Sequence, residues 1–141
     1  MRYAYPYEVR PEPEGGFFIS FPDVPEALTG TESEADVPRI ARDALMAALS
    51  FYTDNERPLP PPSEGQPVAS VPILVALKLA LHEAMLAQGV SNVTLAKRAG
   101  TDEKAIRRMR DLFQATKVEN LEFVLGLLGR RAEVSVLWEA A

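Results

Sequence analysis

The stretch Gly15–Gly30, GGFFISFPDVPEALTG, decides the fold of the N-terminal half of the chain. Phe17, Ile19 and Phe21 fall on one face of an extended segment, because successive side chains of a strand point to opposite faces. The Pro-Asp pair that follows ends this strand. The EALT segment after it predicts a further short strand, and strands joined by such short connections are antiparallel.

The segment before this stretch has the same period of two. In RYAYPYEV, residues 2–9, the three tyrosines and Val9 lie on one face, which predicts a first strand. Pro6 has no backbone N–H, so we expect one side of this strand to be unpaired there.

A helix is predicted after the strands. Ser33 and Asp36 have the spacing of a capping box, with Asp in place of the usual Glu. Pro38 either kinks this helix or marks a later start near Asp36. The buried stripe consists of apolar residues at helical spacing: Val37, Ile40, Ala41, Ala44, Leu45, Ala48 and Tyr52. The proline-rich NERPLPPPSEGQP is extended, and VASV after it predicts a returning strand.

These elements predict an α+β protein with two domains. Residues 1–70 form a βββαβ unit, one sheet with one helix. Residues 71–141 are helical, with helices over 73–88, from Ser91 to Ala99, from Thr101 or Asp102 to Asp111, and over 118–128. The C-terminal AEVSVLW alternates and predicts a final strand.

The charge differs in sign between the two halves. The net charge of the whole chain is −5, but residues 1–70 hold five arginines and twelve acids, whereas the remainder holds ten bases and eight acids. An acidic half attracts a basic partner, and the other half is suited to contact phosphate. There is no cysteine, no apolar run long enough for a membrane span and no signal peptide. We therefore expect a cytoplasmic protein.

The segment SNVTLAKRAGTDEKAIRRM predicts two short capped helices that meet at Gly100, the arrangement of a helix-turn-helix. Leu95, Ala96, Ala99, Ile106 and Met109 are expected to face inward. The outward residues are expected to bind DNA, with the second helix at the bases and flanking cations on phosphate. These DNA-binding candidates are Glu103, Lys104, Arg107, Arg108, Arg110, Lys97 and Arg98.

No catalytic or metal site is predicted. Asp23 lies in a tight turn, but nothing indicates that Glu8 and Glu14 converge on it as a two-metal nuclease requires. The simpler interpretation is that Asp23 caps the turn after Pro22. His82 is expected on a helix surface or in domain packing, and Ser63 in a turn. We predict no cofactor and no enzyme.

The apolar end of the chain has two interpretations. Trp138 either fills a core or, with Val134 and Val136, pairs with a second copy of the chain. An exposed hydrophobic strand favours the second, a homodimer or a higher homo-oligomer. Two DNA-binding units would then meet half-sites one DNA turn apart.

Two resemblances extend this reading. VTLAKRAGTDEKAIRRM…KVENLEFVLGLLG resembles the four-helix, phage-repressor-type helix-turn-helix. The N-terminal half resembles the HicB-like antitoxin family, through the ordered residues Gly15, Gly16, Phe17, Phe21, Pro22, Asp23, Thr29, Ala44, Leu45, Pro62 and Ser63. The chain departs from this pattern at Glu26, where Gly is common, and at Pro38.

The resemblance implies a function. A partial ribonuclease-H-like unit would bind and neutralise a basic, HicA-like toxin that cleaves mRNA, and the C-terminal domain would repress its own operon by binding promoter DNA. Toxin contacts are guessed to lie on the acidic helix at Asp36, Asp43 and Asp54. The alternatives are a solitary helix-turn-helix transcriptional regulator, whose N-terminal domain senses a ligand or dimerises, and, least favoured, a metal-dependent nuclease.

Overall fold

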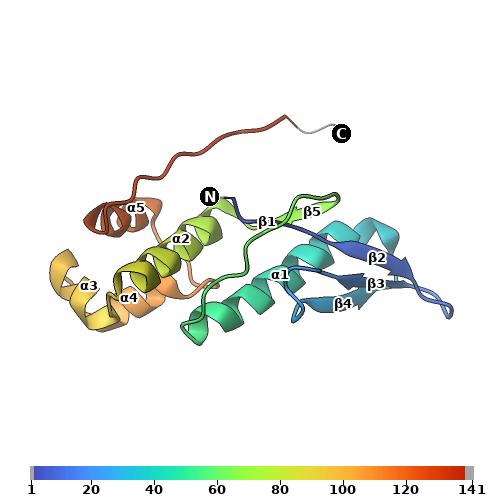
Figure 1. Ribbon diagram of the computed structural model, residues 1–141, viewed down its shortest axis with the longest axis horizontal. Coiled ribbons are helices and arrows are strands. Elements are labelled where there is room, and N and C mark those ends of the chain that lie inside the picture. Colours follow the sequence, from blue (N-terminus) through green and yellow to red (C-terminus); the bar gives the residue numbers. More distant parts are fainter. Residues whose placement is uncertain (1, 139–141) are drawn as a thin grey trace.

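The computed structural model describes residues 2–138 (Figure 1). It is an α+β protein with helices and two small antiparallel sheets. The ends of the two expected domains, residue 1 and residues 139–141, lie outside this range.

The N-terminal strands differ from the expected single sheet. Strand β1 (Ala4–Pro6) pairs antiparallel with β5 (Val68–Ser70), which is the returning strand predicted from VASV. Strands β2 (Glu8–Pro11), β3 (Phe17–Ser20) and β4 (Leu28–Thr31) form a second sheet in that order.

The expected strand over residues 2–9 is thus divided at Tyr7. Pro6 cannot donate a hydrogen bond, and the N–H of Tyr7 reaches the carbonyl of Pro67 at 3.0 Å. Beyond that point the chain changes its partner from β5 to β3.

Helix α1 (Val37–Asp54) follows a single 3₁₀ turn, η1 (Glu34–Asp36). The later of the two predicted starts is correct, because Pro38 lies in the first turn of α1, where its missing N–H breaks no helical bond. The predicted capping box is wrong: neither Ser33 nor Asp36 makes a side-chain cap bond.

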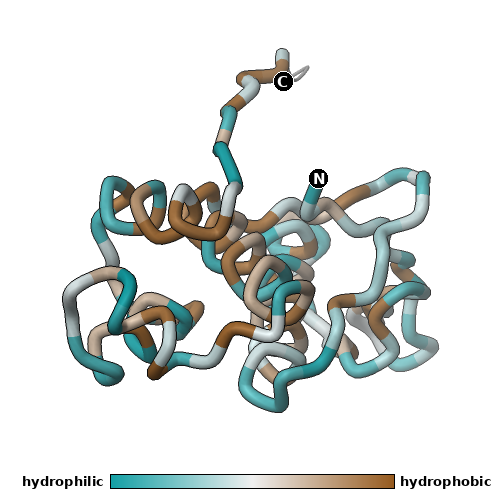
Figure 2. The backbone as a smooth tube through the Cα atoms, turned by 60° about the vertical axis from the view of Figure 1, so that its left-hand side comes forward, coloured by the Kyte–Doolittle hydropathy of each residue, from teal (hydrophilic) through white to brown (hydrophobic). Residues whose placement is uncertain are grey.

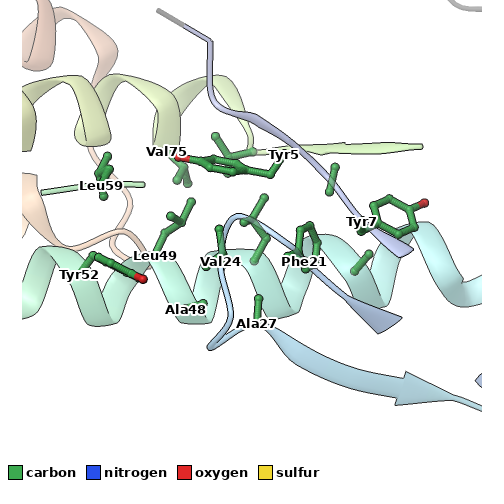
Figure 3. Close-up of a cluster of buried hydrophobic side chains, with 14 of the residues drawn as sticks. Tyr5, Tyr7, Phe21, Val24, Ala27, Ala48, Leu49, Tyr52, Leu59 and Val75 are labelled. Atoms are coloured by element: carbon green, nitrogen blue, oxygen red, sulfur yellow. The ribbon is translucent and has the colours of Figure 1, made fainter. Parts of the chain in front are cut away.

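A first core lies between α1 and the N-terminal strands, and Figure 3 shows it in close-up. Leu45 and Leu49 from α1 and Ile19 from β3 are fully buried there. The loop between β3 and β4 closes the core with Phe21, Val24 and Ala27.

The C-terminal helices begin and end close to the predicted residues. They are α2 (Ile73–Gln88), α3 (Asn92–Ala99), α4 (Glu103–Arg110) and α5 (Val118–Leu127). Gly89 and Gly100 take left-handed conformations, with φ of 63° and 68°, after α2 and α3.

Helix α2 contributes to both cores. Val75 and Leu79 belong to the first core, whereas Leu81 and Met85 pack with α3, α4 and α5 in a second. The two halves of the chain are therefore packed together along one helix.

The predicted final strand is not formed. Residues 130–138 belong to no helix or strand and run away from α5, with apolar and polar positions along them (Figure 2). Val136 and Trp138 are 94% and 97% exposed, so the interpretation of Trp138 as a core residue is wrong. A strand needs a partner for its backbone groups, and the described part of the single chain supplies none here.

Candidate functional site

Helices α3 and α4 are two short capped elements joined by a turn. The Ser91 hydroxyl accepts from the N–H of Thr94 at 3.1 Å, and the Asp102 carboxylate accepts from the N–H of Ala105 at 2.8 Å. These side chains satisfy N–H groups that the first turn of a helix leaves unpaired. Asp102, not Thr101, is therefore the cap of α4.

The inner face of this pair agrees with the sequence prediction. Leu95, Ala96 and Ile106 are buried, and Ala99 and Met109 pack partly buried against the same core. Small alanines on α3 let the two helices approach closely. Burial of this face determines which side chains of α3 and α4 point to solvent.

Five of the predicted cations are exposed on α3 and α4: Lys97, Arg98, Lys104, Arg107 and Arg108. Arg107 donates to Glu103 at 2.6 Å, an i,i+4 pair on the surface of α4. Exposed cations on one short helix pair are suited to phosphate contacts.

Arg110 does not face outward as predicted. Its side chain is only 10% exposed and pairs with Glu56, which follows α1, at 2.9 Å. It also donates to Asn92 of α3 at 2.8 Å and to His82 Nδ1 of α2 at 3.0 Å. Arg110 therefore joins the end of α4 to the N-terminal half of the chain.

His82 belongs to the same junction. It is 1% exposed, and its Nε2 lies 2.7 Å from the carbonyl oxygen of Arg57. Because Nδ1 accepts from Arg110, Nε2 carries the proton and donates to that carbonyl. The domain-packing interpretation of His82 is confirmed.

Lys78 is a site residue that the sequence reading missed. It is fully buried on α2, and its ammonium donates to the carbonyls of Asp111 at 2.6 Å, Gln114 at 2.7 Å and Arg108 at 3.3 Å. These carbonyls lie at and beyond the end of α4, where the regular helical bonding stops. Those of Arg108 and Asp111 also accept backbone N–H groups, at 3.3 and 3.2 Å. Burial lowers the pKa of Lys78, and nearby Asp111 acts in the opposite direction. The position of Lys78 within the apolar stripe of α2 was the signal in the sequence from which its burial could have been predicted.

The three guessed toxin-contact acids lie on or next to α1. Asp36 and Asp43 share one cation, Arg39, at 3.5 and 3.8 Å. The side chains of these two acids and of Arg39 are about half exposed or more. Asp54 is exposed at the other end of α1. The acids therefore lie along the helix and do not converge on one point.

Asp23 differs from its predicted role. It accepts from the N–H and the hydroxyl of Ser63, at 2.7 and 2.8 Å, forty residues along the chain. Ser63 is therefore tethered, and Asp23 holds the proline-rich loop against the β3–β4 loop. Within residues 2–138, no three His, Cys, Asp or Glu side chains lie close enough together to hold a metal ion.

No single helix in the described range is long and apolar enough to cross a membrane, and α2 and α3 reach that length only as a pair bent by 108°.

Comparison with known proteins places this sequence in a family. The model of a HicB-like antitoxin of bacterial toxin-antitoxin systems matches residues 4–80. The chain belongs to this family.

Relatives match over nearly their whole length. Antitoxin HicB of Escherichia coli K12 is 40% identical, over 89% of this chain and 94% of its own. Antitoxin HicB 1 of Photorhabdus laumondii is 38% identical, over 94% of this chain and 86% of its own length. Antitoxin HicB of Pseudomonas fluorescens Pf0-1 is 34% identical over 96% and 95%.

Proposed function

We propose that this chain is the cytoplasmic antitoxin of a two-protein system. Its N-terminal half binds and neutralises a basic, HicA-like toxin that cleaves mRNA, and its α3–α4 pair represses the operon by binding promoter DNA. The observation that carries the proposal is the separation of charge, with twelve acids against five arginines in residues 1–70 and exposed cations on α3 and α4. Such separation steers a basic protein to one half and phosphate to the other.

The DNA-binding part of the proposal assigns α4 as the recognition helix of a helix-turn-helix. Glu103, Lys104 and Arg107 would approach base edges, and Lys97, Arg98 and Arg108 would hold phosphates. Arg110, with its guanidinium held by Glu56 and Asn92, would position the end of α4.

A dimer completes the DNA-binding proposal. Val134, Val136 and Trp138 are 59%, 94% and 97% exposed on an extended segment. Large apolar side chains gathered on one segment favour burial against a partner. A second copy pairing along this segment would set two recognition helices at half-sites one DNA turn apart.

Co-expression with a small open reading frame next to this gene tests the proposal. We expect a complex that co-elutes in size exclusion and restores growth. Lys104→Ala with Arg107→Ala should abolish operator binding and leave growth rescue intact, whereas the exposed Arg10→Ala should change neither. If no complex forms and the neighbouring product is not toxic, the antitoxin proposal is wrong.

A further inference from the structure

A shallow groove of about 410 Å³ separates β4 from α1 on the outer side of the N-terminal half. Its rims are Leu28 of β4 and Phe51 of α1, which are 59% and 45% exposed. Its floor includes Ala44 and Ala47 of α1. The lining therefore combines two large, exposed apolar side chains with small alanines.

The helix explains why this groove is open. The inner face of α1 buries Ala41, Leu45 and Leu49 in the first core. Ala44, Ala47 and Phe51 follow one another at i, i+3 and i+7, so they form a second apolar stripe beside the buried one. The described chain covers neither Leu28 nor Phe51 completely, and solvent-exposed apolar clusters of this kind mark interaction sites.

Carboxylates border the groove. Glu26 lines it, and its carboxylate is held by the Tyr52 hydroxyl at 2.7 and 2.8 Å. Asp43 and Asp54 are eleven residues apart on α1, about three full turns, so they share one edge of the stripe. The cations nearby are engaged: Arg39 pairs with Asp43 at 3.8 Å, and the Arg57 guanidinium lies 5.8 Å from the Phe51 ring.

We propose that this β4–α1 groove is the surface on which the toxin docks. An apolar side chain of the toxin inserts between Leu28 and Phe51, and its cations meet Glu26, Asp43 and Asp54. The inference rests on the proposed antitoxin function and names the site through which it acts. The acidic border and the −7 balance of residues 1–70 disfavour a second copy of this chain as the occupant.

Ala47→Arg is the direct test, because it fills the floor of the groove and adds a positive charge beside its carboxylates at an exposed helix position. Ala87→Arg is the matched control, since Ala87 is an exposed alanine on α2, away from the groove. We expect Ala47→Arg to weaken toxin binding by about 100-fold and the control by less than about threefold. Operator binding and thermal unfolding should be unchanged in both.

A second measurement does not depend on a disruptive substitution. The chain has no cysteine, so Ala47→Cys and Ala87→Cys each provide a single reactive thiol. Saturating toxin should slow alkylation of Cys at position 47 by about tenfold or more and leave position 87 unaffected, because interface cores exclude solvent.

The outcomes separate the two proposals. If toxin binds the wild-type chain while position 47 stays equally reactive and Ala47→Arg binds normally, the groove is not the docking surface, and the antitoxin function stands. If the wild-type chain does not bind the toxin, the proposed function itself is wrong, and the groove inference is overturned with it.

Discussion

Lys78 is a charge held inside the protein by three carbonyl oxygens. Replacing it with methionine keeps the length of the side chain but removes the ammonium that donates to the carbonyls of Asp111, Gln114 and Arg108. We expect Lys78→Met to lower the free energy of unfolding by about 2–4 kcal/mol. Urea denaturation measures this, with the exposed Lys117→Met as a control that should shift it by less than about 0.5 kcal/mol. Equal effects of the two substitutions would contradict the assigned role.

Buried tyrosines make the protein sensitive to alkali. Burial, with Glu83 and Asp23 nearby, raises the pKa of Tyr5 to about 12 from 10.0. Burial and the hydrogen bond to Glu83 raise the pKa of Tyr3 as well. A tyrosine whose pKa is higher in the folded than in the unfolded state stabilises the folded state. This contribution is fully present below the unfolded-state pKa and is lost as pH rises through the folded-state pKa.

The free energy of unfolding should therefore fall as pH rises from about 10 to about 12. The lowered pKa of Lys78 makes the free energy of unfolding rise with pH, but only below the ordinary lysine pKa of 10.5. Tyr5→Phe should reduce the fall by about 1.4 kcal/mol per pH unit in that window. Denaturation at several pH values measures it, and an unchanged slope would contradict the burial of Tyr5.

At the scale of single elements, α4 carries arginines with two different roles. Arg110 is 10% exposed and bonds to Glu56, Asn92 and His82, whereas Arg107 is 67% exposed. Arg110→Ala should cost about 2–4 kcal/mol of stability, because the buried Nδ1 of His82 loses its donor along with the bonds to Asn92 and Glu56. Arg107→Ala should cost less than about 0.5 kcal/mol and weaken operator binding instead. Thermal unfolding and DNA titration of both variants distinguish these roles. A larger loss of stability in Arg107→Ala than in Arg110→Ala would refute the assignment.

The same helices show what the sequence alone could predict. Local signals located α2, α3 and α4 well, because Gly89, Gly100, Ser91 and Asp102 act on neighbouring residues. The outward direction of Arg110 was predicted incorrectly, because its partners Glu56 and His82 are distant in the chain.

The pairing of the strands was predicted incorrectly for a related reason. The alternation of Tyr3, Tyr5 and Tyr7 was recognised, but the change of pairing partner at Tyr7 depends on the carbonyl of Pro67. The bond from Ser63 to Asp23 likewise joins residues forty positions apart in the chain. Alternation in AEVSVLW signals only that a strand is possible, and its partner must be supplied by another segment.

At the scale of the whole molecule, the exposed C-terminal segment predicts association. We expect the wild-type chain to sediment as a dimer and Val136→Ser with Trp138→Ser as a monomer, because burial of these side chains drives pairing. Phe113→Ser removes a 63% exposed phenylalanine elsewhere and should remain dimeric. Analytical ultracentrifugation gives the masses. A monomeric wild type, or a dimeric double variant, would overturn the assignment.

The antitoxin function is the central claim, and inhibition of the toxin's chemistry tests it most directly. RNA cleavage by a purified HicA-like toxin would be followed while increasing amounts of this chain are added. Neutralisation by binding predicts that cleavage falls in proportion to the chain and stops once toxin is saturated. Cleavage that continues undiminished at a large excess of folded chain would contradict the claim.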